Sequence, residues 1–200
     1  MTRLTRRKAI RAGGGSAVAL IAAGGLLTHS SESAVAATGL TANEVSVSSA
    51  DGDLTTLTIA PDITVSWDAQ GTAVAAIKAT WKVKTSSTDE ATVGSTPYTI
   101  SVSSPDTTGS VDHTFSEISL LSNNGGALDG SNFDATTDGG SNTTDVTLSM
   151  DVTLKDSGSN TITSQTDILG PKSYAVTVNN TTSSVNPSVS SSGTANTDGS

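Results

Sequence analysis

Residues 146–154, VTLSMDVTL, carry the pattern that decides the fold of this chain. Apolar and polar residues alternate without a break, and the apolar set is Val146, Leu148, Met150, Val152 and Leu154. Because successive side chains of a β-strand point to opposite faces, this spacing predicts a strand with one buried face and one wet face. An amphipathic helix would need a period of 3.6, and no stretch after residue 36 sustains one.

The same alternation recurs along the chain. It is clear in four further stretches, which are 63–67, 77–83, 98–102 and 174–178. Weaker strands are expected at 44–49, 54–60, 111–120 and 160–168. Turn-forming Gly, Pro, Asp and Ser residues separate these stretches. Eight or nine short strands with such turns predict an all-β fold, an antiparallel β-sandwich with an immunoglobulin-like or fibronectin-like topology.

Two tryptophans on successive predicted strands are the largest candidates for the core. They are Trp67 and Trp81, and the alternation places Trp81 on the inner face of its strand with Ile77, Ala79 and Val83. The chain contains no cysteine, so no disulfide bridges the sheets. We therefore expect hydrophobic contacts alone to hold the two sheets together.

The outer face of the strand at 77–83 carries a stripe of lysines: Lys78, Lys82 and Lys84. One interpretation is a docking stripe for an acidic partner, such as a second copy of this chain. The other is that the lysines protect an edge strand against unwanted pairing, which is a common use of lysine in sheets. The sequence favours the second interpretation.

The N-terminal segment has the features of an export signal. Arg6 and Arg7 form a pair within TRRKAI, an apolar run of 16 residues follows at 12–27, and Ala34-Val35-Ala36 offers small residues for a signal peptidase. The alternative is an uncleaved membrane anchor, but a bilayer span needs about 20 apolar residues. The segment predicts a twin-arginine signal, a route that carries folded proteins, and hence an extracellular or cell-surface protein.

These features divide the chain into four parts. Residues 1–36 are the predicted signal, 37–42 a short entry segment, 43–180 the β-sandwich domain with a long loop at 122–142, and 181–200 a Ser/Thr-rich tail expected to be disordered. Net charge divides sharply between them. In residues 1–36, Lys8 and four arginines against Glu32 give +4, and beyond them five lysines against eighteen acids give −13, which sum to −9.

This composition resembles that of secreted proteins of haloarchaea. The resemblance rests on the acidic excess, the preference for Asp over Glu, the scarcity of Lys and the twin-arginine leader. It implies a protein adapted to high salt, where screening relieves repulsion between carboxylates. So acidic a chain also repels nucleic acid and anionic membrane surfaces, which leaves contact with the membrane only during export.

Motifs for catalysis are missing from the sequence. His113 is the single histidine beyond residue 36, and it lies in a predicted strand, where a structural role is the commoner one. Without cysteine or a second histidine the usual zinc ligand sets cannot form. The sequence also contains no nucleophile elbow, phosphate-binding loop or H-E-x-x-H motif. The sequence therefore predicts a protein that is not an enzyme and needs no resident cofactor.

The loop at 122–142 is the best candidate for a binding site, because long loops in compact domains are often functional. Its oxygen-bearing residues Asp129, Asn132, Asp134 and Asp138 are candidate calcium ligands. The spacing departs from an EF-hand, and the simpler interpretation is a solvated acidic loop with Asp-Gly turns. Phe133 is the one aromatic residue of the loop, too few for the platforms that a glycosidase uses to hold sugar.

Three asparagines match the N-glycosylation acceptor motif. They are Asn142, Asn179 and Asn180, and Thr or Ser is abundant enough for such matches to arise by chance. If modified, they would carry sugar at the end of the long loop and at the C-terminal edge of the domain.

Taken together, the sequence predicts a secreted or surface-exposed structural or adhesive β-sandwich of a halophile, with self-association or another surface protein as its partner. A first alternative is an extracellular module that binds a ligand, a sugar or calcium through the 122–142 loop. A second is a structural protein of a virus or provirus of a halophile host.

Overall fold

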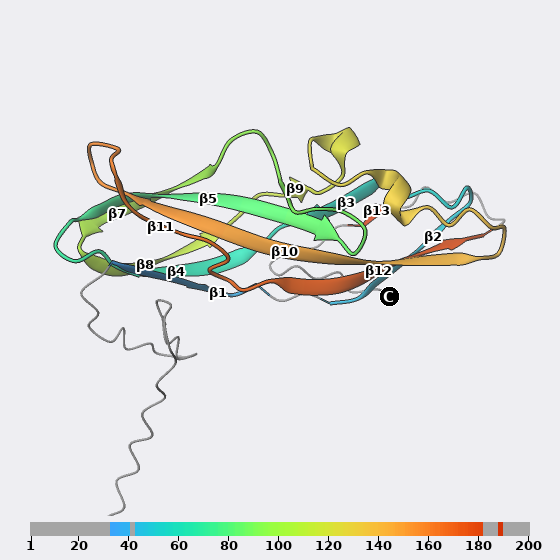
Figure 1. Ribbon diagram of the computed structural model, residues 1–200, viewed down its shortest axis with the longest axis horizontal. Helices are drawn as coiled ribbons and strands as arrows, with labels where there is room; N and C mark the ends of the chain where they lie inside the picture. Colours follow the sequence, from blue (N-terminus) through green and yellow to red (C-terminus); the bar gives the residue numbers. More distant parts are fainter. Residues whose placement is uncertain (1–32, 41–42, 182–187, 190–200) are drawn as a thin grey trace, which may run out of the picture.

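The computed structural model describes residues 33–40, 43–181 and 188–189. Within these residues the chain is all-β, with antiparallel and mixed sheets and two short 3-10 turns. Figure 1 shows an elongated molecule in which the longest strands run along its length. The paired arginines Arg6 and Arg7, and the rest of the predicted signal before Ser33, lie outside the described residues.

The larger sheet is built around the two longest strands. Its order is β2 (Val45–Ser49), β12 (Lys172–Asn180), β10 (Ser141–Lys155), β5 (Val74–Thr85) and β6 (Ala91–Thr92). Two further strands, β7 (Tyr98–Asp106) and β11 (Thr161–Gln165), pair with β5 and β10. All these pairs are antiparallel except that of β2 with β12, which is parallel. A parallel pair requires a long crossover connection, and here most of the domain lies between the two strands.

A second layer lies against this sheet. It contains β1 (Ala34–Thr38), β4 (Asp62–Asp68) and β8 (Thr108–Thr114) in that order. A small sheet of β13 (Ser188–Val189), β3 (Thr56–Ile59) and β9 (Ile118–Ser119) continues it. In Figure 1, β1, β4 and β8 run below β5 and β10.

The second layer is divided where proline interrupts the ladder. Pro61 stands between β3 and β4 and has no N–H to donate, although its carbonyl accepts from Phe115 N at 2.9 Å. The single strand expected at 111–120 is likewise split, because residues 115–117 leave the ladder between β8 and β9. The strands expected at 54–60 and 63–67 are therefore separate, as predicted, whereas the one expected at 111–120 becomes two. The described residues also contain three short strands that the sequence did not predict: β1, β6 and β13.

The register of the two long strands confirms the alternation in the sequence. Met150 lies opposite Trp81 and Leu148 opposite Val83, in an antiparallel ladder that runs from Val146 to Lys155. The predicted inner face of β5 is fully buried, with 0% exposure for Ile77, Ala79, Trp81 and Val83. The lysines lie on the opposite face, as expected.

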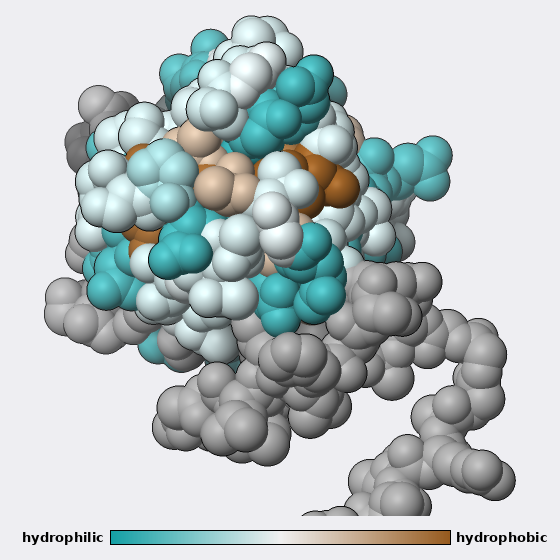
Figure 2. Space-filling view, turned by 90° about the vertical axis from the view of Figure 1, so that its left-hand side faces the viewer, coloured by the Kyte–Doolittle hydropathy of each residue, from teal (hydrophilic) through white to brown (hydrophobic). Residues whose placement is uncertain are grey.

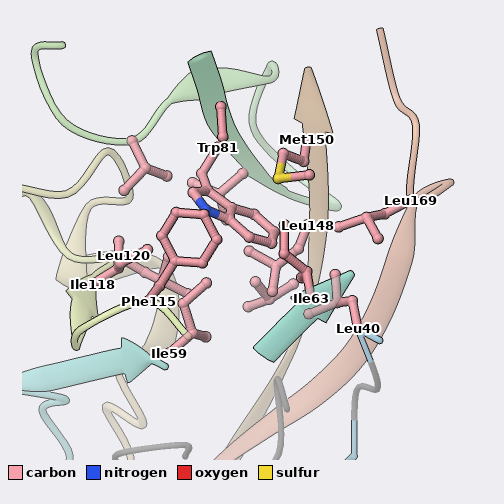
Figure 3. Close-up of a cluster of buried hydrophobic side chains, with 14 of the residues drawn as sticks. Leu40, Ile59, Ile63, Trp81, Phe115, Ile118, Leu120, Leu148, Met150 and Leu169 are labelled. Carbon is pink, nitrogen blue, oxygen red and sulfur yellow. The ribbon is translucent and has the colours of Figure 1, made fainter. Parts of the chain in front are cut away.

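One continuous core joins both layers. Trp81 lies in the larger sheet and Trp67 in the second layer. Both are buried and belong to the same core cluster. Figure 3 shows the Trp81 ring beside Phe115, with Leu148 and Met150 nearby. The Trp81 and Phe115 rings meet edge to face at a centroid separation of 5.5 Å, a favoured geometry for aromatic pairs.

The interpretation of the lysine stripe as protection of an edge strand is wrong. β5 is an interior strand, paired with β10 on one side and with β6 and β7 on the other. Lys82 instead forms ion pairs with Asp151 at 2.8 Å and Glu90 at 3.2 Å, and Lys78 donates to Thr99 Oγ1 at 2.5 Å. Lys82 therefore serves as a countercharge within the outer face of the sheet.

Two segments that the sequence analysis placed outside the domain contain strands in the structure. Residues 34–36, assigned to the signal, form the first part of β1, and Ser188–Val189 of the predicted disordered tail pair with β3 in parallel. The remainder of that tail beyond Thr181 lies outside the described residues. The helices of the described part include none long and apolar enough to span a membrane.

Replacing Trp81 with alanine should lower the free energy of unfolding by about 3–5 kcal/mol, because the change removes a fully buried aromatic ring and leaves a cavity. Lys84→Ala, on the exposed face of the same strand, should change it by about 0.5 kcal/mol or less. Denaturant melts of both variants measure the difference. Equal losses in the two variants would contradict the burial of the Trp81 ring.

Candidate functional site

The loop at 122–142 is anchored to the core by its own buried side chains. It contains two 3-10 turns, η1 (Ser122–Asn124) and η2 (Gly130–Phe133). Leu128, Phe133 and Ala135 are buried members of the core. Single apolar residues without a period give no pattern to find in a sequence, so the sequence could not reveal this packing. Since Phe133 is buried, its ring cannot serve as a sugar platform.

The four calcium candidates of this loop have different local surroundings. Asp129 caps η2, where its carboxylate accepts from Ser131 N at 3.0 Å, and these hydrogen bonds lower the pKa of Asp129. The Asn132 side chain donates to Asp129 O at 2.9 Å. Asp138 is exposed in the turn beyond. Across the described ranges, no three His, Asp or Glu side chains are placed to hold a metal ion.

Asp134 belongs to an acidic cluster whose members lie far apart in the sequence. We define the acidic cluster as Asp51, Asp53, Asp129 and Asp134, which bring the 51–53 turn to the long loop. Partial burial raises the pKa of Asp134, and the nearby carboxylates of Asp53, Asp129 and Asp51 raise it further. Asp51 is itself held by hydrogen bonds from Ser49 Oγ and Asp53 N, which lower its pKa.

Asn180 joins the segments beneath this cluster. Its backbone N–H donates to Gly140 O at 2.9 Å and its side-chain Nδ2 donates to Ala135 O at 2.8 Å. Ala135 N in turn donates to Gly52 O at 2.8 Å, so β12, the long loop and the 51–53 turn share one network. Gly52 has a φ of +78°, and a Cβ there would lie 2.2 Å from Ala135 O, so this close approach requires glycine.

The amides of the three candidate glycosylation sites all donate within the fold. Asn142 Nδ2 donates to Asn132 O and Asp134 O at 3.3 and 3.2 Å. Asn179 Nδ2 donates to Ser46 Oγ at 2.9 Å, and the Asn180 side chain is buried. Glycan transfer needs an accessible amide nitrogen, so modification of Asn180 in the folded domain would require its network to open.

A separate open pocket lies on the larger sheet. Its volume is about 630 Å³, and its lining includes Glu44, Lys84, Thr85, Asp145, Ser173 and Tyr174. Burial raises the pKa of Tyr174, and its Oη has no hydrogen-bond partner within the described residues. The pocket presents hydroxyls and charges of both signs, without an exposed aromatic ring or a nucleophile paired to a base.

His113 has a packing role. It lies on β8 opposite Ile63, and its ring meets Phe115 edge to face at a centroid separation of 4.6 Å. Figure 2 shows one end of the molecule as mainly hydrophilic, with small, separate apolar spots. Neither feature gathers a set of groups that could carry out a reaction.

A comparison with protein-family models, with curated proteins and with solved structures finds no match for this chain.

Asp134→Asn should raise the melting temperature at pH 7 in low salt. A carboxyl whose folded-state pKa lies above its unfolded value stabilises the fold most below that unfolded value, and the contribution is lost as pH rises through the folded pKa. The gain should therefore vanish below pH 3.8, the ordinary pKa of the group, and shrink in 1 M salt, where the screening length is about 3 Å.

Thermal melts at both pH values and both salt concentrations measure this effect. Asp138→Asn makes the same change at an exposed position of the same loop and should shift the melting temperature less. A lower melting temperature of Asp134→Asn at pH 7 would show that the ionised carboxylate stabilises the fold.

Proposed function

We propose that this protein is an exported β-sandwich of the immunoglobulin or fibronectin type, with a structural or adhesive role outside the cytoplasmic membrane. The order of its strands supports the fold. In an immunoglobulin domain, strands A, B and E share one sheet and C, F and G the other. Here β1, β4 and β8 are neighbours in one layer, and β5, β10 and β12 in the other.

The outer face of the larger sheet supports a structural role. Its hydroxyl groups bond one another across strands: Thr143 with Thr177, Thr147 with Ser173, and Thr153 with Ser164, at 2.8–2.9 Å. Such pairs stabilise a sheet by about 0.2–1 kcal/mol each. A face whose polar groups are satisfied internally suits a rigid module in concentrated salt.

The observation that carries the proposal is the composition of the edge strand β2. It ends the larger sheet in the described part of the chain, and its sequence, VSVSS, contains no charge and no proline. Natural proteins usually protect edge strands with such residues, because an open edge pairs readily with another strand. Three of the six lysines, Lys78, Lys82 and Lys84, lie on interior β5 instead. We therefore assign β2 as a surface for self-association by addition of a strand.

Self-association should depend on β2. We expect the secreted protein to form oligomers in molar salt, and Ser48→Lys, which places a charge at an exposed position of this edge, to shift it toward monomer. Thr136→Lys adds the same charge at an exposed loop position and serves as the matched control. Light scattering after size-exclusion chromatography measures the mass. A wild-type protein that stays monomeric at every salt and protein concentration would contradict the assembly.

The repulsion at Asp134 favours a second candidate function, an extracellular calcium-binding module, although the described carboxylates are not already arranged to hold a metal ion. Partial burial and then the neighbouring carboxylates raise the pKa of Asp134, and a bound cation would offset the repulsion. Millimolar calcium at fixed ionic strength should then raise the melting temperature of the wild type and not that of Asp134→Asn, because a ligand stabilises the state that binds it. An equal response of both proteins would exclude the cluster as the site.

The export route has its own test. Arg6→Lys with Arg7→Lys should leave the precursor in the cytoplasm, because the receptor reads the paired guanidinium groups and lysine does not reproduce their geometry. Lys8→Arg, a conservative change beside the pair, is the control and should be exported. Cell fractionation and immunoblotting measure both. Normal secretion of the double variant would exclude the twin-arginine route.

A further inference from the structure

The N-terminal strand β1 is an integrated part of the fold. Its residues pair with β4 in a continuous antiparallel register, from Ala34 opposite Asp68 to Thr38 opposite Thr64. Val35, Ala36 and Ala37 are only 2%, 7% and 5% exposed. Val35 and Ala37 are members of the core cluster, so this strand supplies core residues as well as backbone pairing.

The two residues that follow β1 also pack closely against the domain. Gly39 has a φ of +110°, and a Cβ at this position would lie 2.5 Å from Asp62 O. Leu40 is 6% exposed, and Figure 3 shows its side chain in the same cluster as Ile63 and Leu148. The backbone thus passes close against β4 and adds a further apolar side chain, that of Leu40, to the core.

A cut after Ala36 would divide this strand. It would remove the residues opposite Asp68, Trp67 and Ser66, and with them the buried Val35 side chain. These three of the seven residues of β4 would lose their partners on that side. Proteolysis also requires the target backbone to be free in an open state, and the Ala36–Ala37 bond lies between two buried residues in a paired strand. Cargo that folds before export would present this bond in its protected form.

We propose that the precursor is cut between Ser33 and Ala34, so that β1 stays on the mature protein. This inference rests on the proposed export. Ser31-Glu32-Ser33 provides small residues at the third and first positions before the cut, which is the spacing that a signal peptidase needs. The apparent motif at Ala34-Val35-Ala36 is then a strand of the domain, with small residues because they pack closely on β4.

Intact mass and N-terminal sequencing of the secreted protein, expressed as the full precursor, test this proposal. We expect the mature chain to begin at Ala34. A chain that begins at Ala37 would overturn the proposal, and so would an exported chain that keeps its leader. Retention of the precursor in the cytoplasm would be a failure of the export route instead, so the two failures are distinguishable.

A matched pair of variants locates the bond. Ser33→Glu puts a charged side chain directly before the proposed cut and should cause loss of the mature form with accumulation of the precursor. Ala34→Glu puts the same side chain directly after the cut, where it should be tolerated. The two sites are half-exposed, so neither change buries a charge. The opposite result, with Ala34→Glu blocked and Ser33→Glu processed, would place the cut after Ala36.

Discussion

The pairing of β10 with β5 is the contact on which the rest of the structure depends. Ten residue pairs hold these two central strands together, and every inner residue between them is almost completely buried. Because side chains alternate with a period of two, a slip of one residue would expose Trp81 and Met150 and bury Lys82. The hydrophobic cost of that exchange fixes the register, and the register then sets which residues β12, β7 and the second layer can contact.

The outer surface shows how an acidic chain uses few cations. The pKa of Lys82 is raised chiefly by its hydrogen bond to Asp151, and the pKa of Glu90 is lowered first by the Ser149 hydroxyl and then by Lys82. The interior position of β5 places this lysine between two acidic residues. No cation of the described residues forms an ion pair with the acidic cluster, and there partial burial and then the neighbouring carboxylates raise the pKa of Asp134. Acidic residues therefore form favourable ion pairs around Lys82, whereas they repel one another around Asp134.

Terminal segments cover one long edge of the second layer. β1 pairs with β4, and β13 pairs with β3, which precedes β4 across the break at Pro61. The larger sheet ends at β2, which carries neither charge nor proline. Within the described residues, segments near both ends of the chain thus complete the second layer.

The sequence by itself determined the all-β class, the strands with clear alternation and the inner face of β5, because these follow from local periodicity. It also located Trp67 and Trp81 in the core. Only the tertiary structure decided which strands lie at edges, so the purpose of the lysine stripe was predicted wrongly. The acidic cluster joins Asp51 and Asp53 to Asp134 across some eighty residues, and Asn180 links the same segments. Such contacts have no local pattern, and neither did the short strand β1, whose small residues also fit a peptidase site. Nonlocal packing alone distinguishes these alternatives.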